Sequence, residues 1–200
     1  YLGYALAGEN PDAMTGGRLG RLTGGARQQM GEKTSVFAEQ RYDHGEGPTG
    51  WTQAYGVDFS PFEGWTFGAR YETGTLTDAL GQEMDRMAIG ATADYGSDVL
   101  RWASGLEFRK DDGTTIGERT TVTTRNQITY KATPSLRLFA KANISMSNSD
   151  QEMAMDADFY ELALAGAYRP VDNDRFNMLA KYTYLADLPS PAQVDALGQN

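Results

Sequence analysis

Charged side chains recur at every second position along several stretches of this chain. Alternate residues of a β-strand point to the same side of a sheet, so these charges would share one face. Facing a water-filled passage, they would bias which solutes pass; facing each other across neighbouring strands, opposite charges would pair. The residues of this polar set are Arg70, Glu72, Asp94, Arg101, Glu107, Arg109, Arg125, Lys141, Glu161, Arg169 and Lys181. We expect them to face the interior of a barrel.

Other residues suited to chemistry are few. His44 is the only histidine and follows Asp43, but neighbours along a strand point apart and do not form a catalytic pair. The sequence has no phosphate-binding loop, no dinucleotide-binding glycine pattern, no zinc spacing and no nucleophile elbow. We therefore predict neither an enzyme nor a cofactor. The net charge of −9 argues against nucleic acid as a partner.

Acidic residues gather in the stretches that we expect to be long loops. They are Asp78, Glu83, Asp85, Asp111, Asp112, Glu118, Asp150, Glu152, Asp156 and Asp158. Carboxylate oxygens are the ligands that Ca²⁺ and Mg²⁺ prefer, so divalent cations are candidate partners at these loops. No loop has the EF-hand spacing, and a solvated loop explains the same residues.

Alternation of apolar and polar residues identifies the elements that position these charges. From Trp65, apolar residues at 65, 67, 69 and 71 alternate with Thr, Gly, Arg and Glu, and the pattern recurs to residue 184. Such a period of two indicates half-buried strands. Pro is confined to connections, and no apolar run approaches the length of a membrane helix. We predict an all-β chain with about eleven strands in an up-and-down antiparallel order, two of them at 1–7 and 22–30.

The predicted connections alternate between two kinds. Short ones fall at 31–33, 60–64, 96–98, 132–135 and 170–174, and longer polar ones at 43–50, 75–84, 111–117 and 147–154. Consecutive connections lie at opposite ends of a meander, so the long ones would share one end. Short turns at one end and long loops at the other are typical of outer-membrane barrels.

Aromatic residues lie mostly in the apolar set and near the predicted strand ends. They are Tyr42, Trp51, Phe59, Trp65, Tyr71, Tyr95, Trp102, Phe108, Tyr130, Tyr160, Tyr168, Phe176, Tyr182 and Tyr184. Two aromatic bands around an aliphatic belt are typical of a strand that crosses a bilayer. A soluble antiparallel sandwich would explain the alternation equally well, but it would explain neither the bands nor the loop lengths.

Several stretches resemble very large bacterial outer-membrane proteins, which carry a barrel-forming C-terminal part and are loosely described as OmpA-like or TonB-dependent-receptor-like. These stretches are 34–42, 54–59, 64–74, 107–113, 167–175 and 181–184. The resemblance covers about residues 34 to 195. It implies a location and an architecture and carries no catalytic motif.

Together these features predict that residues 1–200 form one transmembrane β-barrel segment of a longer protein in the bacterial outer membrane. Its partners would be outer-membrane lipid and the remaining strands of the same precursor, because single-chain bacterial barrels have even strand numbers. We expect a channel or transporter with a charge-lined lumen. A non-conducting anchor or translocator for a large surface region is the alternative, and a soluble sandwich that serves as a binding module is the second alternative.

Overall fold

The computed structural model describes residues 1–7, 19–45, 49–77, 81–113, 117–150, 157–171 and 176–189. These residues form eleven strands: β1 (Leu2–Ala7), β2 (Leu19–Met30), β3 (Thr34–Gly45), β4 (Thr49–Phe59), β5 (Trp65–Thr77), β6 (Glu83–Gly96), β7 (Leu100–Gly113), β8 (Gly117–Thr133), β9 (Leu136–Ser149), β10 (Ala157–Tyr168) and β11 (Met178–Pro189). Within the described ranges, no helix has the length and apolar character needed to span a membrane.

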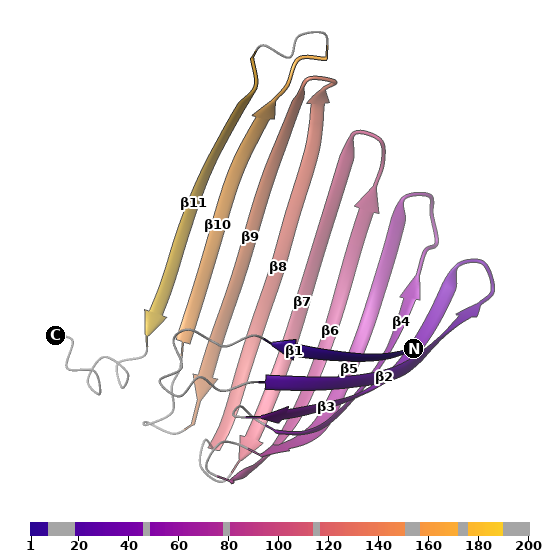
Figure 1. Cartoon of the computed structure of the whole chain (residues 1–200), viewed down its shortest axis with the longest axis vertical. Helices are drawn as coiled ribbons and strands as arrows, with labels where there is room; N and C mark the ends of the chain where they lie inside the picture. Colours follow the sequence, from indigo (N-terminus) through magenta and orange to yellow (C-terminus); the bar gives the residue numbers. More distant parts are fainter. Residues whose placement is uncertain are drawn as a thin grey trace, which may run out of the picture.

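All eleven strands belong to one sheet, in which each strand pairs with its sequence neighbours in the order β1 to β11. Every pairing for which a register is resolved, from β1–β2 to β10–β11, is antiparallel. The predicted all-β, up-and-down meander is therefore confirmed, and the described strands form no second layer of a sandwich. The sheet curls, so that β1 and β2 run at a steep angle to β9–β11 (Figure 1). In the described part, β1 and β11 do not pair with each other, and the sheet stays open.

The strands are longer than predicted, and this removes most of the expected contrast between short and long connections. At one end the connections are 31–33, 60–64, 97–99, 134–135 and 169–177; at the other they are 8–18, 46–48, 78–82, 114–116 and 150–156. The polar stretches that the sequence predicted as loops instead extend the β-strands. Their charged side chains pair across strands, as Arg86 does with Asp111. Loop length is therefore poor evidence here for which end faces outward.

The tight turns at one end of the strands are joined by hydrogen bonds between their backbones. Gly31 and Gly64 adopt positive φ angles of 73° and 76°, a conformation that costs glycine little. The amide of Ser60 donates to the carbonyl of Lys33 (2.7 Å), and the amide of Gly96 donates to that of Gly64 (2.8 Å). These hydrogen bonds link each turn to the next one along this end of the sheet.

The pairing register sorts the strand residues into two faces. One row of direct partners reads Phe37, Gly56, Arg70, Gly90, Glu107 and Thr123 across β3 to β8. The next row reads Tyr55, Tyr71, Ile89, Phe108 and Val122 across β4 to β8. Adjacent rows lie on opposite faces. We call the first the polar face and the second the apolar face.

Burial distinguishes the two faces. Nine described residues are buried, and the register places eight of them on the polar face: Ser35, Thr52, Ala54, Leu76, Ala88, Asp111, Thr121 and Ala163. The ninth is Gly20, which lies opposite His44 on the apolar face. Large side chains on the apolar face are exposed, including Leu164 at 60% and Ile89 at 53%. The accessible area of 13789 Å² exceeds the roughly 9,300 Å² expected of a compact protein of this mass. The sheet thus curls around its polar face and leaves its apolar face uncovered.

Candidate functional site

Ion pairs are concentrated on the polar face. The described residues make nine ion pairs, and the register places eight of them on this face; only Lys110–Glu118 lies on the other. The eight are Arg21–Asp43, Arg27–Asp58, Arg41–Glu39, Arg41–Glu72, Arg70–Glu72, Arg86–Asp111, Arg109–Asp111 and Lys141–Glu161. Three of them, Arg21–Asp43, Arg86–Asp111 and Lys141–Glu161, join neighbouring strands, where opposite charges stabilise the pairing of those strands.

Two acidic residues each hold more than one partner. Glu72 on β5 lies 2.8 Å from Arg70 and 3.7 Å from Arg41 of β3, and Arg41 also contacts Glu39 at 3.0 Å. Glu161 on β10 accepts bonds from Lys141 (2.8 Å) and Asn143 (2.9 Å) of β9. These networks cross-link strands of the polar face on both sides of its centre.

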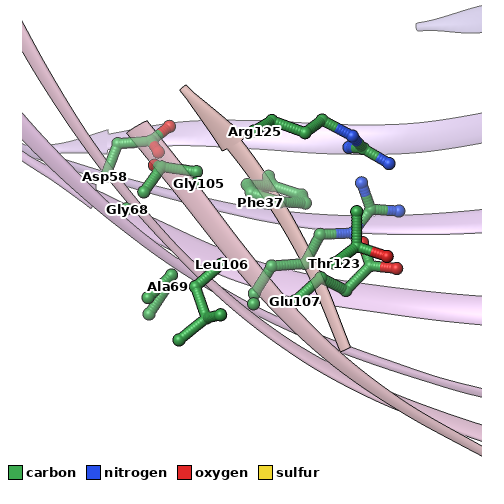
Figure 2. A pocket seen from close by; sticks show the side chains of 13 residues that line it. Phe37, Asp58, Gly68, Ala69, Gly105, Leu106, Glu107, Thr123 and Arg125 are labelled. Atoms are coloured by element: carbon green, nitrogen blue, oxygen red, sulfur yellow. The ribbon is translucent and has the colours of Figure 1, made fainter. Parts of the chain in front are cut away.

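The centre of the polar face is a hollow of about 260 Å³. Its lining runs from Phe37 on β3 to Thr123 and Arg125 on β8, so one cavity spans strands that lie five apart in the sheet. Figure 2 shows Arg125 and Phe37 on one side of the strands and Leu106 and Ala69 on the other.

Glycines leave the hollow open. Gly68, Gly90 and Gly105 contribute to its lining, and a Cβ atom at Gly90 or Gly105 would meet nothing closer than 3.6 Å. Glu107 and Arg125 line the same hollow and make no ion pair within the described part of the chain. The hollow therefore presents one carboxylate and one guanidinium group to water.

Near the opposite end from the tight turns, two arginines contact one aspartate, and a third arginine is its partner in the register. Asp111 on β7 is 4% exposed and accepts two bonds from Arg86 of β6, at 2.7 and 3.1 Å. Arg109 lies 3.5 Å from the same carboxylate, and Arg119 on β8 is the direct partner of Asp111 in the register. We call Arg86, Arg109, Arg119, Asp111 and Thr121 the arginine cluster.

The polar face is cationic although the chain as a whole is acidic. Among the strand residues whose side chains are described, thirteen cationic side chains lie on this face against eight anionic ones. The cations are Arg21, Arg27, Arg41, Arg70, Arg86, Arg101, Arg109, Arg119, Arg125, Lys131, Arg137, Lys141 and Lys181, and the anions are Glu39, Asp43, Asp58, Glu72, Asp94, Glu107, Asp111 and Glu161. The chain's net charge of −9 is therefore carried outside this face.

Ten of the eleven charged residues singled out in the sequence lie in strands on the polar face, and Arg169 follows the end of β10. Four of the ten, Arg70, Glu72, Lys141 and Glu161, join the networks described above, and Arg109 joins the arginine cluster. Within the described part of the chain, the remaining five make no ion pair: Asp94, Arg101, Glu107, Arg125 and Lys181.

The sequence prediction missed other charges on this face, including both partners of Arg21–Asp43 and Arg27–Asp58. It also read Asp111 as part of a solvated loop, and this was wrong: Asp111 is a buried strand residue bound by two arginines. The alternation of 34–45 and 49–59 would have placed the first two pairs. Continuing the alternation of 100–109 through Asp111 would have found the third.

Aromatic rings cluster on the apolar face. Trp65 lies 5.0 Å from Tyr95 and 5.8 Å from Trp102, between ring centres, and Tyr42 lies 4.8 Å from Trp51. On β11 the register sets Tyr182 opposite Leu164 and Tyr184 opposite Leu162. Three phenylalanines depart from the pattern, since Phe37, Phe139 and Phe159 lie on the polar face. The assignment of the aromatic bands to membrane interfaces stays a prediction.

Asp43 and His44 lie on opposite faces. Asp43 pairs with Arg21, whereas His44 stacks between Tyr4 and Tyr42, with ring centres 5.8 Å away on each side. In the described residues, no three His, Asp or Glu side chains converge as a metal site. Asp78, Glu152 and Asp156 lie outside the described residues, and divalent cations at the loops stay a prediction.

Lys110 and Glu118 form the one ion pair that the described residues make on the apolar face, beyond the aromatic residue Phe108. Their charged atoms are 2.6 Å apart, and the side chains of Lys110 and Glu118 are 35% and 45% exposed. The Glu118 carboxylate raises the pKa of the Lys110 ammonium, because the hydrogen bond between them favours the charged form. This partly exposed ion pair lies near the ends of β7 and β8 that are away from the tight turns.

No protein-family model matches this chain, and no curated protein matches it. Among solved structures, the chain is similar to KdgM porin, with 10% identity, a TM-score of 0.40, and coverage of 92% of this chain and 89% of that chain. It is also similar to NanC porin in a rhombohedral crystal form, with 12% identity, a TM-score of 0.39, and coverage of 93% and 96%. Identity at this level concerns the course of the backbone and transfers no residue role.

Proposed function

We propose that this chain forms most of the wall of a transmembrane β-barrel in the bacterial outer membrane, with the polar face as the lining of a solute channel. The observation that carries the proposal is the placement of the two faces. The concave face holds eight of the nine ion pairs and eight of the nine buried residues described, whereas large apolar side chains cover the convex face. A protein folded in water buries its large apolar side chains. A barrel in lipid exposes them and keeps its charges inside.

The hollow at Phe37, Glu107 and Arg125 supports the channel form of this proposal. Its glycines leave space, and two of its charged groups have no partner in the described part of the chain, so water would fill it. Rings of charged side chains bias which ions and polar solutes pass. The chemistry would be passive passage, and no residue would need to act as an acid, base or nucleophile.

A non-conducting anchor is the second candidate, and the ion-pair networks favour it. Glu39, Arg41, Arg70 and Glu72 tie β3 to β5, and Phe37, Phe139 and Phe159 also occupy the polar face. Side chains of this size could close a narrow bore. Bore width decides between the two candidates, and conductance measures it directly.

The absence of cysteine from the chain allows a clean test with single cysteines. Thr92 is exposed on the polar face between Gly68 and Gly105, and Leu106 is 53% exposed on the apolar face nearby. After reconstitution into planar bilayers, a charged, membrane-impermeant thiol reagent should reduce conductance through Thr92→Cys and leave Leu106→Cys unchanged. Insertion without any conductance would favour the anchor. Reaction at Leu106→Cys and not at Thr92→Cys would refute the assignment of the faces.

A further inference from the structure

We infer that the arginine cluster is a binding site for an oxyanion group, a carboxylate, sulfate or phosphate, carried by a dissolved solute. The inference deepens the proposed channel function and rests on the polar face being a wet lumen wall. It begins from the charge balance. Arg86 of β6 and Arg109 of β7 pair with the single carboxylate of Asp111, and Arg119 of β8 is the residue opposite Asp111 in the register. These three cations and one anion leave an excess of two positive charges.

The pairing of these charges is uneven. Arg86 uses two of its N–H groups on Asp111. Arg109 lies 3.5 Å from Asp111 but without the geometry of a hydrogen bond from its Nε atom, and Arg119 has no ion pair within the described part of the chain. The Asp111 carboxylate is therefore already occupied by Arg86, and the Nε atoms of Arg109 and Arg119 are left without an acceptor among the described residues.

Buried polar atoms without partners supply the second observation. Nε of Arg109, Nε of Arg119 and Oγ1 of Thr121 are all buried and have no hydrogen-bond partner among the described residues. Thr121 is 4% exposed and lies directly across from Arg109 and two residues after Arg119 on the same face. Buried donors without acceptors destabilise a protein, most of all when they are charged. An oxyanion would accept from two guanidinium groups and one hydroxyl group.

Among the described residues, the acidic side chains of the neighbouring strands do not neutralise this site. Glu72 belongs to the same row as Arg109 but lies two strands away, where it holds Arg41 and Arg70. Glu107 is two residues before Arg109 on β7 and makes no ion pair in the described part of the chain. Asp112 and Glu118 point to the opposite face. Arginine suits a planar or tetrahedral oxyanion because its N–H groups are fixed in a fork.

The test is a calorimetric titration of the refolded full chain in detergent micelles with inorganic sulfate, at constant ionic strength. We expect saturable binding. Arg119→Gln and Thr121→Val should each weaken it, the first by roughly tenfold or more, as expected for loss of one charge-assisted bond. Arg119 makes no ion pair in the described residues, so its replacement should leave folding intact. Arg101→Gln is the matched control, because Arg101 is also a cation of the polar face without an ion pair in that part of the chain.

Binding that is absent, or equally weakened by Arg119→Gln and Arg101→Gln, would overturn the site. A second arm repeats the titration in vesicles with and without lipopolysaccharide. Loss of sulfate binding only where lipopolysaccharide is present would show that lipid phosphate fills the cluster and would overturn the assignment to a dissolved solute. Sulfate binding in a barrel that never conducts would contradict the proposed channel function and would still support the oxyanion site. Conductance without saturable sulfate binding would support the channel function and contradict the oxyanion site.

Discussion

Replacement of Leu164 by arginine tests whether the apolar face meets lipid. Leu164 lies on β10 midway between Tyr160 and Tyr168, and its side chain is 60% exposed. The eight steps from Tyr160 to Tyr168 span about 26 Å at roughly 3.3 Å per residue, and a strand tilt of about 40° reduces this to about 20 Å of membrane depth. This agrees with an apolar band of about 25 Å and places Leu164 near its middle.

The expected penalty follows from that depth. Arginine near the bilayer midplane costs roughly 2–4 kcal/mol, and near an interface about 0–1 kcal/mol. In water, an exposed position away from special features would change stability by only about 0.5 kcal/mol in either direction. Leu164→Arg should therefore lower the free energy of unfolding by about 2–4 kcal/mol in a membrane, and Tyr160→Arg by less.

The measurement is the free energy of unfolding of the chain refolded into lipid vesicles, from reversible denaturant titration. Thr92→Arg is the control on the other face, because Thr92 is exposed there and lies between two glycines. It should cost much less than Leu164→Arg. Equal penalties at Leu164 and Thr92, or a larger one at Thr92, would refute our assignment of the faces.

Three further outcomes follow from the polar face and its surroundings. A Cβ atom at Gly56 would overlap the ring of Phe37 and lie 2.9 Å from the carbonyl oxygen of Ala69, so Gly56→Ala should destabilise the chain by about 1–3 kcal/mol in denaturant titration; Gly90→Ala, whose Cβ meets nothing closer than 3.6 Å, should not. Glu72→Gln leaves Arg70 and Arg41 without their shared carboxylate and should cost about 1–3 kcal/mol, a value that a loss below about 0.5 kcal/mol would contradict. Glu118→Gln breaks the exposed pair with Lys110 and should cost at most about 1 kcal/mol; a much larger loss would mean that this end of β7 and β8 is not in water.

The sequence predicts the elements of this fold well because its alternation is long and regular. Strand number, antiparallel order and the shared face of ten of the eleven charged residues singled out follow from a period of two and from the positions of the turns. The strand ends were not predicted, because polar residues at the end of a strand look like a loop until their cross-strand partners are known. Arg86 and Asp111 are 25 residues apart, and only the register between β6 and β7 brings them together.

The arginine cluster shows why the functional part of the site needs the structure. Arg109 has the parity of every other charged residue on the polar face, so its type and position alone do not separate it from Arg101 or Arg125. What separates it is its surroundings: a carboxylate already bound by Arg86, a second arginine across β8, and a buried hydroxyl group without a partner. Each of these depends on which residues stand opposite one another. A shift of the β7–β8 register by one residue would turn Arg119 and Thr121 to the apolar face, and the site would not exist.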